Sequence, residues 1–448
     1  MNQLTEEQII QLAPDAPSLA AGKGLASAPK WNSFAYNERV LWGDIKGSGT
    51  DPYRTQIDLG NTAFKCNCPS RKFPCKHGLG LYLLFARSPE AFTKTDEEPV
   101  WVKEWIDKRA TKPVVSAEPV PANNETAVKQ TKAREKRQNK RLEEITGGIT
   151  ELDLWVKDLL RNGLLNFPEK DHTFWQKTAA RMVDAKAPGL GNMVKEFGEI
   201  NYFSGNAWQT QALEQATRLY LLLESARNME NLPPALDEDV KSLLGISRTQ
   251  KELMEDAGAE KIKDTWLVLG RQREVNNDDL TIQRDWLFGA QSCRFALLLN
   301  FAYRGAPIQN LVVPGKATQA ELVFYPGNNP LRAVIKVVGS SSAAFMPQTM
   351  LSHWDAAQEH YAQVLSRLPW AESVPMFVSN ILPVMQNNQW YLKDTQGYVM
   401  PLPPAFDIQK MYQLLALSGG VAIHVAFLRQ KDTIFPLGIW TDGKYKLI

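Results

Sequence analysis

The spacing of apolar side chains changes along this 448-residue chain, and each change predicts a different kind of element. Near the N-terminus, Thr5 to Gln8 resembles a capping box and predicts a short helix that ends before Pro14. Residues 40–49 have the pattern of a strand and turn, and residues 53–59 alternate apolar and polar side chains as a half-buried strand does. Residues 78–87 return to helical spacing, with apolar side chains at Leu79, Tyr82, Leu83 and Ala86.

The middle of the chain has helical periodicity throughout, from residue 142 to residue 260. One apolar face comprises Leu152, Trp155, Val156, Leu159 and Leu160, and a second comprises Ala212, Ala216, Leu219, Tyr220 and Leu223. From about Trp266 the strand pattern returns, in segments 266–269, 295–303, 320–325, 332–338, 421–428 and 435–440, with a helix expected over 352–367. These patterns predict a multidomain α+β protein with a small strand-and-helix module, a helical middle region and a strand-rich mixed C-terminal region.

Proline and charge mark the expected boundary between the first two regions. Residues 111–128 contain three prolines among small and polar residues, and Lys129 to Arg141 holds seven basic residues and one acidic residue. We therefore predict a module over 1–110, a Pro-rich then basic linker over 111–141, a helical domain over 142–260 and an α+β domain over 261–448.

Overall composition adds little to this division. The net charge is +2, so only a local patch would attract nucleic acid or a membrane. The N-terminus lacks the basic start and apolar run of a secretory signal, and no apolar stretch approaches the ~20 residues of a membrane helix. We expect a cytoplasmic protein without a membrane partner, in which clustered cysteines are more often metal ligands than disulfides.

Three of the four cysteines fall within ten residues and are followed by a histidine. Cys66 and Cys68 form a C-x-C pair, and Cys75 and His77 form a C-x-H pair six residues later. On extended backbone, residues i and i+2 face the same side, so each pair can point two ligands one way. Three thiolates and one imidazole complete a tetrahedral Zn²⁺ shell without room for substrate. Free core thiols and a redox C-x-C pair are the alternatives, and they fit this ligand spacing less well.

This ligand pattern, together with its flanks, resembles the SWIM zinc finger over roughly residues 50–90. The flanks are Trp42-Gly43-x-Ile45-x-Gly47-Ser48-Gly49, Pro52-Tyr53 and the run from Cys68 to His77. The remainder, notably Ala179 to Leu190, is similar to bacterial SWIM proteins found beside MoxR-type AAA+ ATPases and von Willebrand A-domain proteins. The resemblance implies zinc held by the four residues above, and a protein partner of one of these two kinds. SWIM fingers as a class also imply DNA binding as the alternative.

Two basic segments bear on that alternative. Residues 61–87 contain Lys65, Arg71, Lys72, Lys76 and Arg87 without a carboxylate, which leaves +4 after three thiolates and one zinc ion are included. This charge can contact phosphates, or it can simply offset the negative metal centre, and the second interpretation is the plainer one. The run from Lys129 to Arg141 carries a net +6 and is either a nucleic-acid or acidic-protein contact or a solvated helical lead-in.

Signatures of catalysis are missing from the sequence. His353 and His360 are seven residues apart on an expected helix, whereas zinc hydrolases place two histidines four apart. His172, His424 and Cys293 stand alone, and we interpret Cys293 as a buried strand residue. We therefore expect no catalytic residues and a non-enzymatic adaptor that binds a protein partner; an enzyme within the C-terminal region is the weakest of the three hypotheses.

Overall fold

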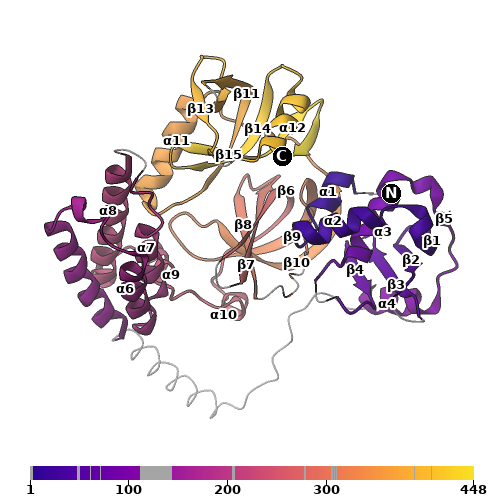
Figure 1. Ribbon diagram of the computed structural model, residues 1–448, viewed down its shortest axis with the longest axis horizontal. Helices are drawn as coiled ribbons and strands as arrows, with labels where there is room; N and C mark the ends of the chain where they lie inside the picture. The colour runs from indigo at the N-terminus through magenta and orange to yellow at the C-terminus, as the bar shows by residue number, and fades with distance from the viewer. Residues whose placement is uncertain are drawn as a thin grey trace, which may run out of the picture.

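A computed structural model describes residues 4–47, 51–60, 62–70, 72–110, 144–203, 207–276, 279–303, 306, 308, 310–387, 389–404 and 406–448. Figure 1 shows a helical region on one side, a barrel at the centre, a second sheet above the barrel, and the N-terminal module on the far side. The predicted linker over 111–141, including the basic run from Lys129 to Arg141, lies outside the described residues.

The N-terminal module is a sheet covered by helices. Its strands have the order β4-β3-β2-β1-β5. They are β1 (Trp31–Tyr36), β2 (Val40–Ile45), β3 (Tyr53–Asp58), β4 (Ala63–Cys66) and β5 (Thr93–Lys94), and the helices are α1 (Glu6–Ile10), α2 (Ala16–Leu25), α3 (Lys76–Arg87) and α4 (Val100–Ala110). Leu41 packs with α1 and α3 on one face of the sheet, whereas Val40 and Trp42 pack with α4 on the other. Both faces are covered, so β2 is buried almost throughout and loses the alternation of a half-exposed strand.

The middle region is a helical bundle. Residues 144–161 are helical, followed by α6 (His172–Asp184), α7 (Pro188–Phe197), α8 (Ala207–Arg227), α9 (Pro234–Leu244) and the short α10 (Gln250–Glu255). Both predicted apolar faces contribute to one core, except that Tyr220 of the second face is exposed. A Cβ at Gly189 would lie 1.7 Å from the carbonyl oxygen of Leu243, so the close packing of α7 against α9 requires glycine there.

The strand-rich region contains two sheets. The first is a closed barrel of order β10-β8-β7-β6-β9, made of β6 (Lys261–Val275), β7 (Leu280–Gly289), β8 (Phe295–Tyr303), β9 (Lys316–Phe324) and β10 (Arg332–Ala343). The second has the order β13-β12-β11-β14-β15-β16, made of β11 (Val374–Gln386), β12 (Gln389–Lys393), β13 (Val399–Pro401), β14 (Ile423–Gln430), β15 (Thr433–Thr441) and β16 (Lys444–Leu447). Helices α11 (Trp354–Arg367) and α12 (Ile408–Ser418) pack on this second sheet.

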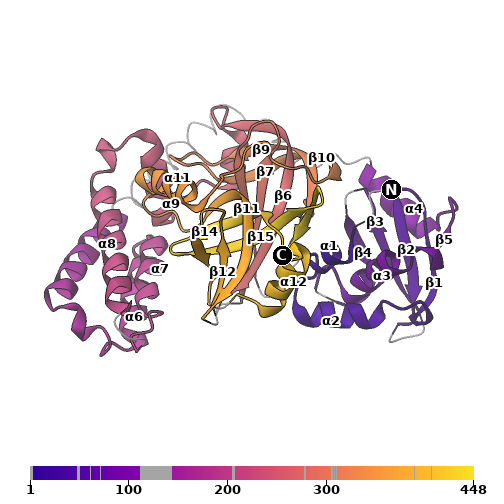
Figure 2. The same ribbon diagram turned by 90° about the horizontal axis from the view of Figure 1, so that it is seen from above.

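Apolar side chains join the barrel to the second sheet. Outward-facing residues of the barrel, such as Leu267 and Trp286, share a cluster with Phe377 and Trp440 of the second sheet. The bundle is held to the second sheet by a reciprocal contact, in which Trp370 Nε1 donates to the Arg218 carbonyl and Arg218 Nη2 donates to the Trp370 carbonyl. The bundle, the second sheet and the barrel are therefore packed together, and the bundle and the N-terminal module lie at opposite ends of the molecule (Figure 2).

The N-terminal module also contacts the barrel directly, although more than 150 residues separate them in sequence. Val313 of the β8–β9 connection is buried in the core of the module. Gln8 Nε2 donates to the Pro314 carbonyl at 3.3 Å, and Arg273 Nη1 of β6 donates to the Ala13 carbonyl. Figure 2 shows α1 and α2 between the sheet of the module and the rest of the chain.

The predicted fold class is confirmed, with a helical middle region and a strand-rich C-terminal region. Three local predictions are wrong or incomplete. Helix α2 was not expected from the sequence. His353 precedes α11 and caps it instead of lying on its face. Cys293 is exposed, in the β7–β8 turn with φ of 52°, and is not a buried strand residue. Among the described residues, no helix combines the length and apolar composition needed to cross a bilayer.

Candidate metal centre

The four predicted ligands come together where a hairpin meets the start of a helix. Strand β3 pairs with β4 so that Thr55 lies opposite Cys66, the last residue of β4. The chain enters α3 further on, and Cys75 is the N-cap of this helix. His77 lies in the first turn of α3, two residues further on. The sheet edge therefore supplies the C-x-C pair and the helix N-terminus supplies the C-x-H pair.

The four ligand atoms of Cys66, Cys68, Cys75 and His77 all lie within 4.8 Å of one another. His77 Nδ1 is 3.8 Å from Cys66 Sγ and 4.0 Å from Cys75 Sγ. Ligands bound tetrahedrally at about 2.0–2.3 Å from zinc would lie about 3.5–3.8 Å apart. The side chains thus converge on one centre with separations slightly wider than those of a filled site, and they fit a metal ion.

Groups around the ligands hold them in place. Thr55 Oγ1 donates to Cys66 Sγ at 3.2 Å, and the Gly78 amide donates to Cys75 Sγ at 3.5 Å. The ring of His77 lies 5.0 Å from the ring of Tyr53, centroid to centroid. Cys75 and His77 are only 6% and 5% exposed, whereas Cys66 and Cys68 are partly buried. Because Cys75 caps a helix N-terminus, the helix dipole also favours its thiolate.

The three thiols differ in their pKa. Hydrogen bonding from Cys75, together with His77 and Thr55, lowers the pKa of Cys66 to about 4. The same hydrogen bond, and burial, raise the pKa of Cys75, and burial raises the pKa of Cys68. A metal ion that binds all three sulfurs therefore has to displace protons from Cys75 and Cys68.

Ion pairs within the module engage part of the basic charge predicted around the centre. Lys72 Nζ lies 2.7 Å from Asp15 Oδ2, and Arg87 is paired with Glu6 of α1. Lys65 and Lys76 are exposed, while Arg71 lies outside the described residues. Two of the four described basic side chains thus have carboxylate partners supplied by the N-terminal segment.

The remaining histidines are dispersed. His353 Nδ1 accepts from the Ala356 amide as the N-cap of α11, and His172 lies in the first turn of α6, 2.9 Å from Gln176 Nε2. His360 of α11 is partly buried, which lowers its pKa. His424 belongs to β14 in the second sheet. None of them joins the Cys66–His77 group among the described residues.

Sequence reasoning missed the residues that support the ligands, and one of them had a usable signal. Once residues 53–59 are interpreted as a strand, a tight hairpin places Thr55 directly opposite Cys66. Asp15 had no such signal, because it reaches Lys72 only through the unexpected helix α2.

Comparison with known proteins bears on the middle of the chain. Residues 140–244 match the model of the SWIM-associated four-helix bundle domain. The match covers residues 144–161 and α6 to α9, whose apolar faces form the bundle core. The chain matches no curated protein and no solved structure. The bundle match and the Cys₃His group together bear out the resemblance to SWIM-type zinc-finger proteins.

Proposed function

We propose that this protein binds one zinc ion through Cys66, Cys68, Cys75 and His77, and that it acts as a non-enzymatic adaptor whose SWIM module contacts a protein partner. The observation that carries the proposal is the convergence of three thiols and one imidazole on a single centre, in a chain that also contains a bundle domain associated with SWIM fingers. A Cys₃His set fills the tetrahedral shell of zinc, so the metal stabilises the module and performs no hydrolysis.

Zinc is the metal that best suits these ligands. Thiolates select zinc, copper(I) and iron–sulfur clusters over magnesium or calcium, and a tetrahedral mixed S/N set is typical of zinc. The sulfurs are present as free thiols rather than disulfides, which fits the reducing cytoplasm in which we place the protein.

The proposed partner is an AAA+ ATPase or a von Willebrand A-domain protein, on the basis of the family resemblance. The alternative is DNA binding through the finger and the basic run from Lys129 to Arg141, which the exposed Lys65 and Lys76 support. The ion pairs of Lys72 and Arg87 weaken it, because charge already neutralised within the module is less free for phosphates.

The first test is metal content. Elemental analysis of the purified protein should give about one zinc per chain, and Cys68→Ser should lose it. Cys293→Ser is the matched control, since Cys293 is a free, exposed cysteine that does not belong to the Cys66–His77 group. A Cys68→Ser protein that retains full zinc would exclude the proposed site.

The second test distinguishes a protein partner from nucleic acid. Purified AAA+ ATPase and von Willebrand A-domain protein from the same cell are each mixed with the wild-type chain, Cys68→Ser and Cys293→Ser. We expect capture by wild type and by Cys293→Ser alone. Binding to neither protein, with a DNA affinity that falls steeply with salt, would favour the nucleic-acid alternative.

A further inference from the structure

The inner wall of the barrel changes from apolar to charged toward the mouth that faces the N-terminal module. The deeper part is filled by apolar side chains that include Trp266, Val268 and Leu287. A bulge between Val268 and Gly270 then shifts the register of β6 against β7. Alternation after this bulge places Arg271, Arg273 and Val275 on the inner face, in that order toward the mouth.

A network of polar side chains follows, which we call the polar belt: Arg271, Arg273, Gln283, Asp285 and Asn310. Arg271 Nε donates to Asp285 Oδ1 at 2.5 Å, and the two side chains are 1% and 2% exposed. Gln283 Nε2 donates to Asp285 Oδ2 at 2.8 Å and to Asn310 Oδ1 at 3.1 Å. Arg273 Nε donates to Gln283 Oε1 at 2.8 Å.

The polar belt contains more positively charged side chains than negatively charged ones. Two guanidinium groups share one carboxylate, Asp285, and buried Arg271 Nη1 has no hydrogen-bond partner among the described residues. Burial, followed by repulsion from Arg271, lowers the pKa of Arg273 to about 10. Burying unpaired charge is costly, so an additional acceptor at this place would stabilise the belt.

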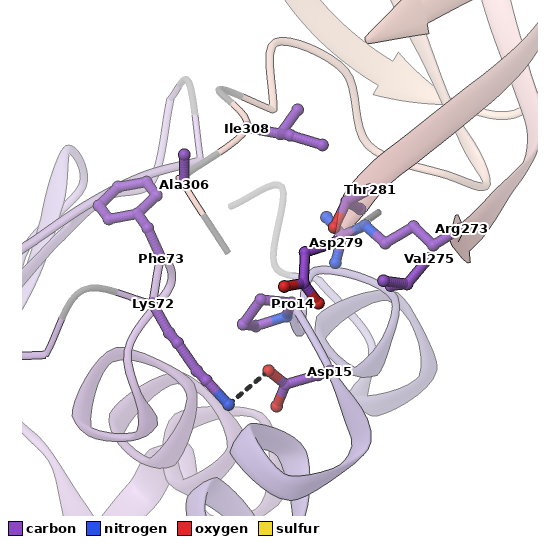
Figure 3. A pocket seen from close by; sticks show the side chains of 10 residues that line it. All are labelled: Pro14, Asp15, Lys72, Phe73, Arg273, Val275, Asp279, Thr281, Ala306 and Ile308. Atoms are coloured by element: carbon purple, nitrogen blue, oxygen red, sulfur yellow. Dashed lines mark ion pairs between the residues drawn. The ribbon is translucent and has the colours of Figure 1, made fainter. Parts of the chain in front are cut away.

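Next to Arg273 there is a cavity of about 450 Å³ between the barrel and the N-terminal module. Figure 3 shows Arg273, Val275 and Asp279 on the barrel side, with Pro14, Lys72 and Phe73 on the module side. Pro14, Phe73 and Val275 give the cavity apolar walls. Lys72 is paired with Asp15, which leaves Arg273 as the remaining cation among the described residues that line the cavity.

We propose that this cavity binds a small molecule that carries one carboxylate or phosphate group on an apolar body. The oxyanion accepts charge-assisted hydrogen bonds from the guanidinium group of Arg273. Arg273 Nε and Nη1 already donate to Gln283 and to the Ala13 carbonyl, so Nη2 is the nitrogen that remains for the ligand. The apolar body packs against Pro14, Phe73 and Val275. Asp15 and Asp279 also line the cavity and oppose a second negative charge, so a polyanion such as nucleic acid does not fit.

The zinc loop contributes to this site. Lys72 and Phe73 lie between Cys68 and Cys75, so, if the proposed function holds, a zinc ion bound to these cysteines would fix Lys72 and Phe73 on the module side of the cavity. Binding of the small molecule therefore depends on the metal, although the ligand does not contact it.

The probes for the test are acetate, succinate, 4-fluorobenzoate and inorganic phosphate, measured by calorimetry and, for the fluorinated probe, by ¹⁹F NMR with the full-length zinc-loaded protein. The neutral isostere 4-fluorobenzamide is the control for shape. We expect 4-fluorobenzoate to bind and 4-fluorobenzamide to bind at least about tenfold more weakly, as lost charge-assisted hydrogen bonds imply. Absence of binding by all four anions, or equal binding of acid and amide, would overturn the proposal.

Variants locate the binding. Arg273→Gln should weaken 4-fluorobenzoate binding by about tenfold or more, whereas Arg284→Gln should leave it unchanged. Arg284 is the matched control because it lies on the same barrel and pairs with Glu274 near the surface. Should Arg273→Gln fail to fold, Asp279→Asn provides the decisive arm: removing that carboxylate should tighten binding of the anions. If the affinity for 4-fluorobenzoate is unchanged in Asp279→Asn and in a folded Arg273→Gln, the probe binds elsewhere and the proposal is wrong.

Discussion

The metal centre and the polar belt both bury polar atoms, but the two clusters give these atoms different kinds of bonding partner. At the metal centre, four ligand atoms from a sheet edge and a helix N-terminus point at one another within 4.8 Å. In the polar belt, side chains of the neighbouring strands β6 and β7 form a hydrogen-bond network on the inner wall of the barrel, and Arg271 Nη1 has no hydrogen-bond partner among the described residues. The first cluster is closed, whereas the second opens onto a cavity.

The difference shows where the energy of each cluster comes from. Three thiols and an imidazole gain little from one another, so under the proposed function we expect the module to need a metal ion to hold them together. The belt is held by charge-assisted hydrogen bonds that the chain provides itself. Removing the metal should therefore unfold one region, while removing a belt residue should leave a buried charge unpaired.

Loss of the metal gives the largest expected effect. Cys75→Ser retains a good helix N-cap, since serine caps helices well, but removes one ligand. Binding of structural zinc is worth on the order of 10–16 kcal/mol, so the N-terminal module should lose its protection against proteolysis. Limited proteolysis with zinc analysis measures this, and Cys293→Ser should behave as wild type. A Cys75→Ser module that resists protease without zinc would show that the core around α3 is sufficient alone.

Breaking the belt should cost less. Asp285→Asn leaves Arg271 buried without its counter-ion, and we expect a loss of about 3–5 kcal/mol in the free energy of unfolding. The paired replacement Arg271→Met with Asp285→Leu removes both charges and should cost far less, or even stabilise the barrel. Denaturant titration followed by tryptophan fluorescence distinguishes them, since Trp286 is next to Asp285 on β7 and Trp266 lies further along β6. Equal losses in the single and paired variants would contradict the charge argument.

The metal centre could be predicted from the sequence, whereas the polar belt could not. Cys66, Cys68, Cys75 and His77 fall within twelve residues and belong to scarce residue types, so their spacing alone indicated one site. Arg271 and Asp285 are common residues fourteen apart, and they meet only because a bulge at Val268 and Gly270 turns Arg271 inward. A register shift of this kind leaves no local mark in the sequence.

A similar reason explains the helix that sequence reasoning missed. The segment Ala16–Leu25 is rich in alanine and glycine and has no strong apolar face. It is positioned by tight packing on α3, where a Cβ at Gly80 would lie 2.7 Å from Leu25 Cβ. The bounds of a periodic helix, such as the one over residues 352–367, were predicted to within two residues. Its apolar side chains recur with helical spacing and pack into a core, so the pattern marks the helix by itself.

Acid should affect the metal centre through the protons that the thiols hold. The pKa of Cys75 and of Cys68 is raised, so both sulfurs are protonated at neutral pH before metal binds. Each proton displaced weakens zinc binding by about tenfold for every pH unit of acidification. Zinc transfer to a chromogenic chelator, measured between about pH 8 and about pH 6, should therefore become steadily easier. A flat profile would indicate that the sulfurs bind metal without releasing protons.

The smallest expected effect lies where the two regions meet. Asp15→Asn removes the charge that pairs with Lys72 but keeps the cap of α2, because asparagine accepts from the Ser18 amide as well as aspartate does. Both side chains are substantially exposed, so the free energy of unfolding should fall by about 0.2–1 kcal/mol. Lys72, once released, faces the cavity beside Arg273, so the affinity for 4-fluorobenzoate should increase by about two- to fivefold, and high salt should remove the gain. Calorimetry at low and high salt measures both the free energy of unfolding and the affinity for 4-fluorobenzoate. An unchanged affinity would mean that Lys72 does not act on the ligand, and that Arg273 is its cation among the described residues of the cavity.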